Sequence, residues 1–211
     1  MASGAHSHPD RPSGRQTDPR PGDAIAVRAA RPSDAEAICA IYNHEVLHTT
    51  ATFDLVPRSL DDQVQWLAAR SGAFSAIVAV DPAEPDPLAG GGAGDGAVVG
   101  FAALSPYRER AAYRTSVEDS VYVRRDRGGE GIGTLLLDSL LDLAESSGFH
   151  AVFARIEASG TASRALHARC GFELVGIERE TGRKFNRWLD VALMECVLRE
   201  RGLRSPGSRQ R

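Results

Sequence analysis

A glycine-rich segment at residues 124–134, RRDRGGEGIGT, carries the strongest chemical signal of the chain. It lies between an apolar run at 116–123 and a helical pattern that begins near Gly131. Glycines allow backbone N–H groups to converge, and the N-terminus of a helix adds partial positive charge. The segment is therefore suited to hold a pyrophosphate, although an ordinary tight strand-to-helix connection has a similar composition.

Two further sets of residues could take part in chemistry. His167 lies in the segment SRALHARCGF at 163–172, and its side chain titrates near neutral pH, so it could act as a general acid, as a general base or only in packing. Arg108 and Arg110 lie in a connector rich in Arg and Tyr, and a fork-shaped guanidinium suits a carboxylate or phosphinate unless it is simply solvated. His44 and His48 are one helical turn apart, but no third ligand accompanies them, so no metal site is predicted.

The elements that must position these residues are predicted from hydrophobic periodicity. A strong helix is expected over 131–147, with Ile132, Leu135, Leu136, Leu140, Leu143 and Ala144 on one stripe and Gly148 as terminator. Strands are expected at 25–29, 74–80, 98–104, 116–123, 151–156, 173–180 and 188–198, and a further helix at 162–170. This order predicts one α/β (α+β) domain around a mixed sheet.

Two early helices are predicted from their capping residues. Ser33 and Glu36 form a capping-box pattern after Pro32, so a helix should begin there. Ser59 should cap a second helix that runs to Arg70, with Val64, Trp66 and Leu67 on its apolar side.

Three segments fall outside this periodic pattern. Residues 1–24 combine Pro, Gly, Ser and charge without an apolar stretch and are expected to form a disordered tail. Residues 81–96, DPAEPDPLAGGGAGDG, are expected to form a flexible insertion away from the chemistry. Residues 199–211 are a basic C-terminal tail, which leaves a domain at 25–198.

The composition limits the partners and the compartment. The chain has 211 residues, 42% hydrophobic composition and a net charge of −3, and it contains no basic block suited to nucleic acid or a membrane surface. Its three cysteines are far apart, which predicts reduced thiols in a cytoplasmic protein.

Taken in order, the strand, the R-G-G-E-G-I-G turn, the long helix and the later G-F turn at 171–172 resemble the GNAT superfamily of N-acetyltransferases. In that superfamily the first turn is the pyrophosphate loop of acetyl-CoA, and the helix before the second turn flanks the pantetheine arm. The resemblance implies the GNAT fold, a mixed central sheet of six to seven strands flanked by helices. It also implies acetyl-CoA as co-substrate and no metal.

Further motifs narrow the resemblance to the branch that acetylates phosphinothricin and methionine sulfone. They are I-Y-N-H-E at 41–45, T-F at 52–53, A-Y at 112–113 before T-S-V-E-D-S-V-Y-V at 115–123, and G-R-K-F-N-R-W-L-D at 182–190. The resemblance covers residues 25–198 and implies a homodimer.

The resemblance assigns the site residue by residue. The catalytic residues are Glu118 and His167. The cofactor-binding residues are Val121, Tyr122 and Val123 along the pantetheine arm, and Gly129, Glu130, Gly131, Ile132, Gly133 and Thr134 around the pyrophosphate. The substrate-binding residues are Arg108, Glu109, Arg110, Glu118, Asp119 and Ser120.

The chemistry explains why such residues are needed. An α-ammonium is not nucleophilic until it loses a proton, and Glu118 can accept that proton directly or through water, or attract the ammonium electrostatically. A backbone N–H can stabilise the negative charge that develops on the thioester oxygen. His167, where the superfamily usually has Tyr, can protonate the leaving sulfur or act as a base.

The chain departs from the superfamily pattern at two positions. Gly128 replaces a Gln or Arg of the pyrophosphate loop, and Gly160 replaces an Asn that contacts pantetheine. Arg127 is a candidate substitute for the first, and Ser159 or Thr161 for the second.

Two alternatives remain open at this point. One is a GNAT enzyme for another amine, such as a polyamine, an antibiotic or a protein N-terminus. The other is a non-catalytic acyl-CoA sensor. The arginines at 108 and 110 favour an anionic amino-acid analogue over a polyamine.

Overall fold

The computed structural model describes residues 25–85 and 95–201. The predicted tail at 1–24, the greater part of the insertion and almost all of the C-terminal tail lie outside the described residues. No helix among the described residues is long and apolar enough to cross a membrane.

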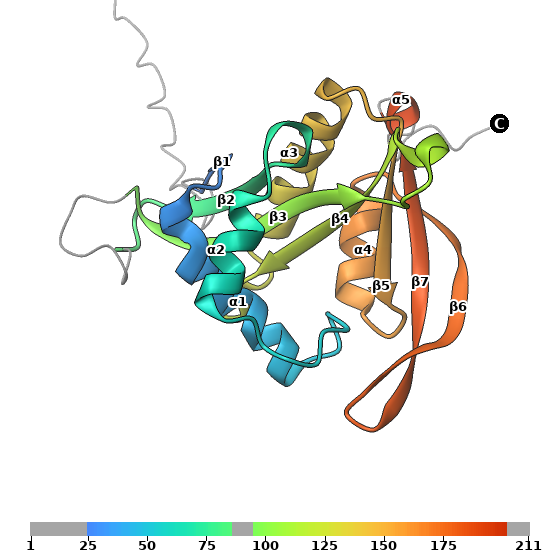
Figure 1. Ribbon diagram of the computed structural model, residues 1–211, viewed down its shortest axis with the longest axis horizontal. Coiled ribbons are helices and arrows are strands. Elements are labelled where there is room, and N and C mark those ends of the chain that lie inside the picture. The colour runs from blue at the N-terminus through green and yellow to red at the C-terminus, as the bar shows by residue number, and fades with distance from the viewer. Residues whose placement is uncertain (1–24, 86–94, 202–211) are drawn as a thin grey trace, which may run out of the picture.

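A seven-stranded mixed sheet forms the centre of the fold, as expected (Figure 1). Its spatial order is β1-β2-β3-β4-β5-β7-β6, and the β4–β5 pair alone is parallel among its neighbours. The strands are β1 (Ala26–Ala29), β2 (Ala76–Asp81), β3 (Ala97–Pro106), β4 (Ser116–Val123), β5 (Ala151–Glu157), β6 (Glu173–Lys184) and β7 (Arg187–Val197).

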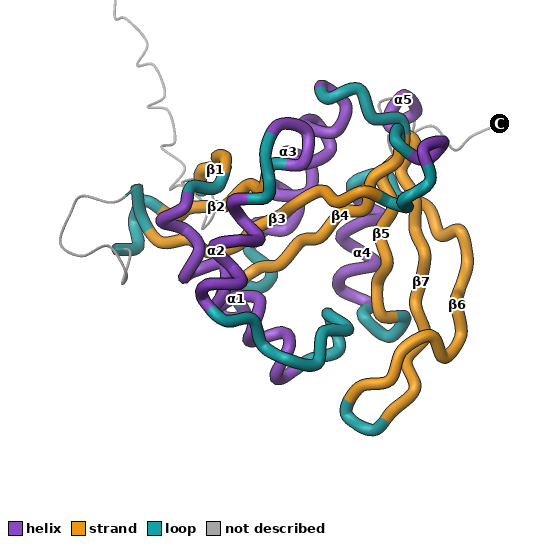
Figure 2. Tube along the Cα trace, viewed as in Figure 1, coloured by secondary structure: helices purple, strands orange, loops and turns teal. Residues whose placement is uncertain are grey.

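Helices cover both faces of the sheet, and each face has its own apolar core. One core joins α1 (Ala35–His48) and α2 (Leu60–Ala68) to the sheet. The other joins α3 (Ile132–Ser146) and the end of α4 (Thr161–Arg169) to the opposite face, and α5 (Leu198–Arg201) follows β7. Figure 2 shows the two helix pairs on either side of the strands.

The start of α1 differs from the predicted capping box. A short 3₁₀ turn occupies Pro32–Asp34, and α1 begins only at Ala35. The carboxylate of Asp34 accepts a hydrogen bond from the N–H of Arg31 at 2.6 Å and is also bonded by Arg28, so Asp34 has the role predicted for Glu36, and the N-cap residue of α1 makes no side-chain capping bond. The reason is that the fixed φ of Pro32 favours a tight first turn.

The cap of α2 is confirmed, whereas its expected apolar side is only partly correct. The Ser59 hydroxyl accepts a hydrogen bond from the N–H of Asp62 at 3.1 Å. The helix ends at Ala68 rather than Arg70, and Val64 is 43% exposed while Gln63 is fully buried. Leu67 is buried as expected.

The long helix α3 is confirmed, but its buried face is wider than the predicted stripe. Leu137 and Leu141 are fully buried, whereas Leu135 is 38% exposed. The width follows from two contacts, because α3 packs both on the sheet and against α4.

The strands β4 and β5 separate after three paired positions, and this separation positions the site. They pair in parallel at Ser116–Glu118 with Ala151–Phe153 and then diverge, as Figure 1 shows. Beyond Glu118, β4 still pairs with β3 along one edge, whereas its other edge no longer pairs with β5.

The strand β6 extends four residues beyond its predicted end, β7 is displaced by one residue from its predicted bounds, and the two strands form a two-residue hairpin. Lys184 pairs with Arg187, and the loop residues Phe185 and Asn186 have φ of 48° and 59°. Two positive φ angles are typical of a type I′ turn, whose twist matches that of the strands.

Candidate active site

A cavity of about 690 Å³ lies where β4 and β5 diverge. One wall is formed by 118–123 of β4 and another by 154–157 of β5. The loop after α1 at 49–53 and one side of α4 complete it, and α4 contributes Ser163, Leu166 and His167 to the lining. Both predicted catalytic residues, Glu118 and His167, therefore line the cavity.

Alternation along β4 divides its side chains between the two faces of the sheet. Ser120 and Tyr122 lie opposite Ala103 and Phe101, which belong to the core under α1, and Glu118 shares their face. Asp119 lies opposite Leu104, which belongs to the core under α3. Glu118 and Asp119 are therefore adjacent in sequence but lie on opposite faces.

Glu118 is partly buried beside the point of divergence. It lies opposite Ser105 of β3 and Phe153 of β5. Burial raises the pKa of the Glu118 carboxyl, and the positive charges of Arg155 and Arg108 partly oppose this rise. Arg155 is itself bonded to Glu178 at 2.6 Å. The arrangement gives a carboxylate whose affinity for a proton is increased.

His167 and Asp119 form a buried pair on the other face. The imidazole Nε2 lies 3.0 Å from Asp119 Oδ2, and the two side chains are only 5% and 2% exposed. The imidazole Nδ1 lies 2.8 Å from the carbonyl oxygen of Ser163. Burial lowers the pKa of His167, but Asp119 and the Ser163 carbonyl outweigh it and leave that pKa raised.

The glycine-rich turn begins directly after β4, and Gly128 borders the cavity. Gly129 and Gly131 both have φ of +86°, which L side chains rarely adopt, and Gly131 is the N-cap of α3. Ile132, Gly133 and Thr134 form the first turn of α3, where backbone N–H groups have no intrahelical partner. A Cβ on Gly133 would lie 3.0 Å from Leu166, so this glycine allows α3 and α4 to approach each other.

The start of the 81–96 insertion contacts this turn, which corrects the expectation that the insertion lies away from the chemistry. Glu84 bonds Arg124 and Arg127, and Asp81 bonds Arg127 at 2.8 Å. Arg127 also pairs with Glu130. The Arg127 guanidinium thus faces three carboxylates, which argues against it as the substitute for the missing loop side chain at Gly128.

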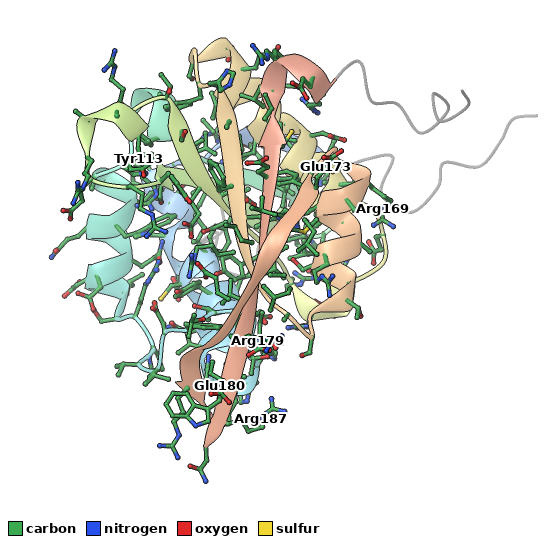
Figure 3. The ribbon with its side chains drawn as sticks, turned by 90° about the vertical axis from the view of Figure 1, so that its right-hand side faces the viewer. Tyr113, Arg169, Glu173, Arg179, Glu180 and Arg187 are labelled. Carbon is green, nitrogen blue, oxygen red and sulfur yellow. The ribbon has the colours of Figure 1, made fainter. Side chains whose placement is uncertain are left out.

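The predicted substrate-binding residues fall into two groups. Glu118, Asp119 and Ser120 line the cavity, although Asp119 is directed to His167. Arg108, Glu109 and Arg110 are exposed and do not line it. They follow Pro106, which pairs with Val117, so they lie at the same end of β4 as Glu118. Figure 3 shows Tyr113 of this connector far from Glu180 and Arg187 on the β6–β7 hairpin.

Contacts that the sequence patterns did not reveal close the cavity. Thr50 Oγ1 donates to Glu157 Oε2 at 3.1 Å and so joins the loop after α1 to the end of β5. Buried Lys184 donates to the carbonyl of Thr52 at 2.8 Å and ties the hairpin to the same loop. Buried Glu45 pairs with Arg125 and joins α1 to the glycine-rich turn. The one sequence signal for these contacts is the pattern R-x-R-G-G at 125–129, whose two arginines indicate that the turn has acidic partners.

Within the described ranges, no group of three or more His, Cys, Asp or Glu side chains is arranged to hold a metal ion. His44 and His48 do contact each other, with ring centroids 4.9 Å apart.

The sequence matches the model of the acetyltransferase (GNAT) family over residues 47–172. It is 39% identical to a phosphinothricin N-acetyltransferase of Streptomyces coelicolor, over 84% of this chain and 99% of that protein. It is 37% identical to an L-methionine sulfoximine/L-methionine sulfone acetyltransferase of Pseudomonas paraeruginosa, over 83% of this chain and 95% of that protein.

The fold is also similar to solved structures. A phosphinothricin acetyltransferase from Sinorhizobium meliloti, in complex with acetyl-CoA, superposes with a TM-score of 0.75 at 34% identity, covering 88% of this chain and 95% of that one. A putative acetyltransferase from Salmonella typhimurium, also with acetyl-CoA, gives a TM-score of 0.74 at 34% identity, covering 82% and 94%.

Proposed function

This chain belongs to the GNAT family of acetyltransferases and is an N-acetyltransferase, and from that premise we propose that it acetylates the α-amino group of a small amino-acid analogue. Acetyl-CoA is the proposed donor, and phosphinothricin, methionine sulfone and methionine sulfoximine are the proposed acceptors. The names of the relatives support this substrate class. The observation that carries the proposal is the position of Glu118 at the divergence of β4 and β5, on the face opposite the His167–Asp119 pair.

The donor is bound along the unpaired edge of β4 and at the turn that follows. Val121, Tyr122 and Val123 line the cavity, and their backbone groups can pair with the amides of pantetheine. The turn from Gly129 to Thr134 offers free N–H groups and the positive end of the α3 dipole to the pyrophosphate. When bound, acetyl-CoA supplies an activated acetyl thioester, and the N–H groups of β4 stabilise negative charge on its oxygen.

Glu118 accepts the proton that the substrate ammonium must lose. Its raised pKa brings it closer to the pKa of an amino group, which makes proton transfer easier. Ser120 lies on the same face of β4, two residues further along, and is the second residue of β4 that we assign to the acceptor. Glu118 and Ser120 thus define the acceptor side of the cavity.

Recognition of the acceptor's anionic groups is assigned to Arg108 and Arg110, with Glu109 between them. The positive charge of Arg108 lowers the pKa of Glu118, which supports an electrostatic role for Arg108 at the acceptor side. A guanidinium binds a carboxylate or phosphinate through two parallel hydrogen bonds. A polyamine would instead be repelled by these cations.

We also infer that the protein is a cytoplasmic homodimer. The edge strand β6 exposes Leu174, Val175 and Ile177, and the hairpin exposes Phe185 and Trp188. An exposed apolar edge strand favours association with another chain. Figure 1 shows the β6–β7 hairpin extending beyond the rest of the domain.

A thiol-release assay with acetyl-CoA tests the proposal. The acceptors are phosphinothricin, methionine sulfone, methionine sulfoximine, spermidine and a peptide with a free N-terminus. Release with the first three alone is expected. Release only with spermidine or the peptide would overturn the substrate class, and acetyl-CoA binding without release for any acceptor would instead support an acyl-CoA sensor.

A further inference from the structure

The glycine-rich turn contains three arginines, and carboxylates already occupy two of them. Arg127 faces three carboxylates and is not among the described residues that line the cavity. Arg124 lines the cavity, but Glu84 and Asp126 accept four hydrogen bonds from its guanidinium, which has five N–H groups in all. Neither side chain can therefore give a phosphate the paired hydrogen bonds that a guanidinium typically provides.

Arg125 differs from both in its exposure and in its partners. It lines the cavity together with Gly128, and its side chain is 56% exposed. Its carboxylate partner in the described part of the chain is Glu45 of α1, which accepts hydrogen bonds from Nε at 2.7 Å and from Nη2. The other three N–H groups, two on Nη1 and one on Nη2, have no partner among the described residues.

Glu45 is held from a second side and so fixes the direction of this guanidinium. Its side chain is only 4% exposed, and its Oε2 also accepts a hydrogen bond from the Thr49 hydroxyl at 2.7 Å. Burial raises the pKa of Glu45, but the hydrogen bonds from Arg125 and Thr49 outweigh burial and leave that pKa lowered, so the carboxylate is ionised. Because Glu45 holds the edge that carries Nε, the Nη1 group of Arg125 is turned away from this carboxylate.

We propose that Arg125, oriented by Glu45, binds the pyrophosphate of acetyl-CoA in place of the side chain that the turn lacks at Gly128. The inference rests on the proposed use of acetyl-CoA as donor in this cavity. It assigns a part in donor binding to α1, which acts through the carboxylate that holds the arginine.

The chemistry of the pair suits this role. Phosphate oxygens accept several hydrogen bonds, and three free N–H groups on one rigid plane can serve more than one of them. Without Arg125, the backbone N–H groups at the start of α3 would have to compensate the charges of the pyrophosphate alone. An arginine anchored on a buried carboxylate also loses less freedom when it binds than a solvated one does.

The substitution Arg125→Gln tests the proposal by binding alone, without an acceptor. Isothermal titration calorimetry should show a Kd for acetyl-CoA about tenfold higher than in the wild type, because hydrogen bonds to a charged group are lost. Acetyl-dephospho-CoA, which keeps the pyrophosphate but lacks the 3′-phosphate, should lose affinity by the same factor. Pantetheine, which has no phosphate, should bind both proteins equally in an NMR titration.

A second variant separates binding from stability. Arg125→Gln leaves the buried Glu45 carboxylate without its cation, which can destabilise the fold. The double variant Glu45→Gln/Arg125→Gln removes both charges, so its Tm should return toward that of the wild type while the Kd for acetyl-CoA stays about tenfold higher. Arg199→Gln removes the same charge from an exposed position on α5 and is the control, with its Kd within twofold of the wild type.

Three results would overturn the proposal. One is an unchanged Kd for acetyl-CoA in Arg125→Gln, and the second is a wild-type Kd in the double variant. The third is a loss of affinity for acetyl-CoA but not for acetyl-dephospho-CoA, which would assign Arg125 to the 3′-phosphate. A wild type that binds acetyl-CoA but acetylates none of the acceptors would remove the proposed substrate class and leave this comparison intact.

Discussion

At the scale of single residues, the two faces of one strand separate two neighbouring carboxylates. Glu118 and Asp119 are neighbours, yet strand alternation directs the first to the acceptor side and the second to His167. Two carboxylates can thus have different roles because their surroundings differ. Glu118 has a raised pKa through burial, and Asp119 is compensated by an imidazole.

Replacing the Glu118 carboxylate with an amide should affect turnover more than donor binding. We expect Glu118→Gln to lower kcat by about 10² or more, because general-base catalysis contributes on this order, and to leave the Kd for acetyl-CoA nearly unchanged. Steady-state kinetics and isothermal titration calorimetry measure the two quantities. Glu145→Gln on the exposed side of α3 is the matched control, and unchanged turnover in Glu118→Gln would remove this residue from the mechanism.

The pH dependence should follow the charges around Glu118. Arg155 lowers the pKa of Glu118, so Arg155→Met should raise that pKa further. A base with a higher pKa is deprotonated only at higher pH, so the acidic limb of the kcat/KM profile should move upward. In this variant Glu178 would also lose Arg155 as its partner. The negative charge of Glu178 would then raise the pKa of Glu118 further. A limb that stays in place or moves downward would contradict Glu118 as the group that titrates.

At the scale of elements, the glycine-rich turn combines a backbone requirement with a network of charges. The positive φ angles of Gly129 and Gly131 direct the chain from β4 into α3. Arg124 and Arg127 beside it are held by carboxylates, among them Asp81 at the end of β2 and Glu84 in the connection between β2 and β3. The turn is thus supported by a segment distant in sequence.

Gly131 should be needed for donor binding and not only for stability. Gly131→Ala and Gly148→Ala each place a Cβ at a positive φ where no atom lies within 4 Å. Both should therefore cost about 1 to 2 kcal/mol of unfolding free energy. Only Gly131→Ala should also weaken acetyl-CoA binding, which chemical denaturation and calorimetry together would show. Equal donor affinity in the two variants would exclude this turn as the pyrophosphate site.

Glu84 should compete with the donor's phosphates for the arginines of the turn. In Glu84→Gln, Arg124 and Arg127 lose a shared carboxylate, so the local potential becomes more positive. We expect tighter binding of acetyl-CoA at low ionic strength and a steeper loss of affinity with added salt. Weaker binding in this variant would instead mean that Glu84 serves to orient the arginines.

At the scale of the whole molecule, the cavity depends on contacts between parts that are far apart in the sequence. The loop after α1 is joined to β5 by Thr50 and Glu157 and to the hairpin by Lys184. Gly182 leaves room for the ring of Phe53 against β6, because a Cβ there would lie 2.2 Å from the ring. The proposed acceptor side is therefore assembled from the loop after α1, β4, β5 and the β6–β7 hairpin.

The exposed apolar hairpin should hold two copies together. Trp188 is 60% exposed, so Trp188→Asp should leave the monomer folded and convert a dimer to a monomer, as light scattering after size exclusion would measure. Val64→Asp on α2, where the side chain is 43% exposed, is the control and should leave the dimer intact. If the wild-type protein is a monomer, or if Trp188→Asp leaves the dimer unchanged, the proposed interface at the hairpin is wrong.

Much of the fold was determined by local sequence. The alternation in 116–123, the apolar periodicity of 132–144 and the turn glycines at 129 and 131 each predict an element from neighbouring residues alone, and the structure confirms the strand and the helix. Ser59 likewise predicted the start of α2, and its capping hydrogen bond confirms the prediction. Such signals are readable because backbone preference and side-chain period act within a few residues.

Only the tertiary structure decided how the site is completed. The pairing of Asp119 with His167, of Arg127 with Asp81 and of Lys184 with Thr52 joins residues that are 48, 46 and 132 positions apart. No local pattern encodes these contacts, because a charged side chain in a sequence looks the same whether it is solvated or paired. Its partner is fixed only when strand order and helix packing bring distant segments together.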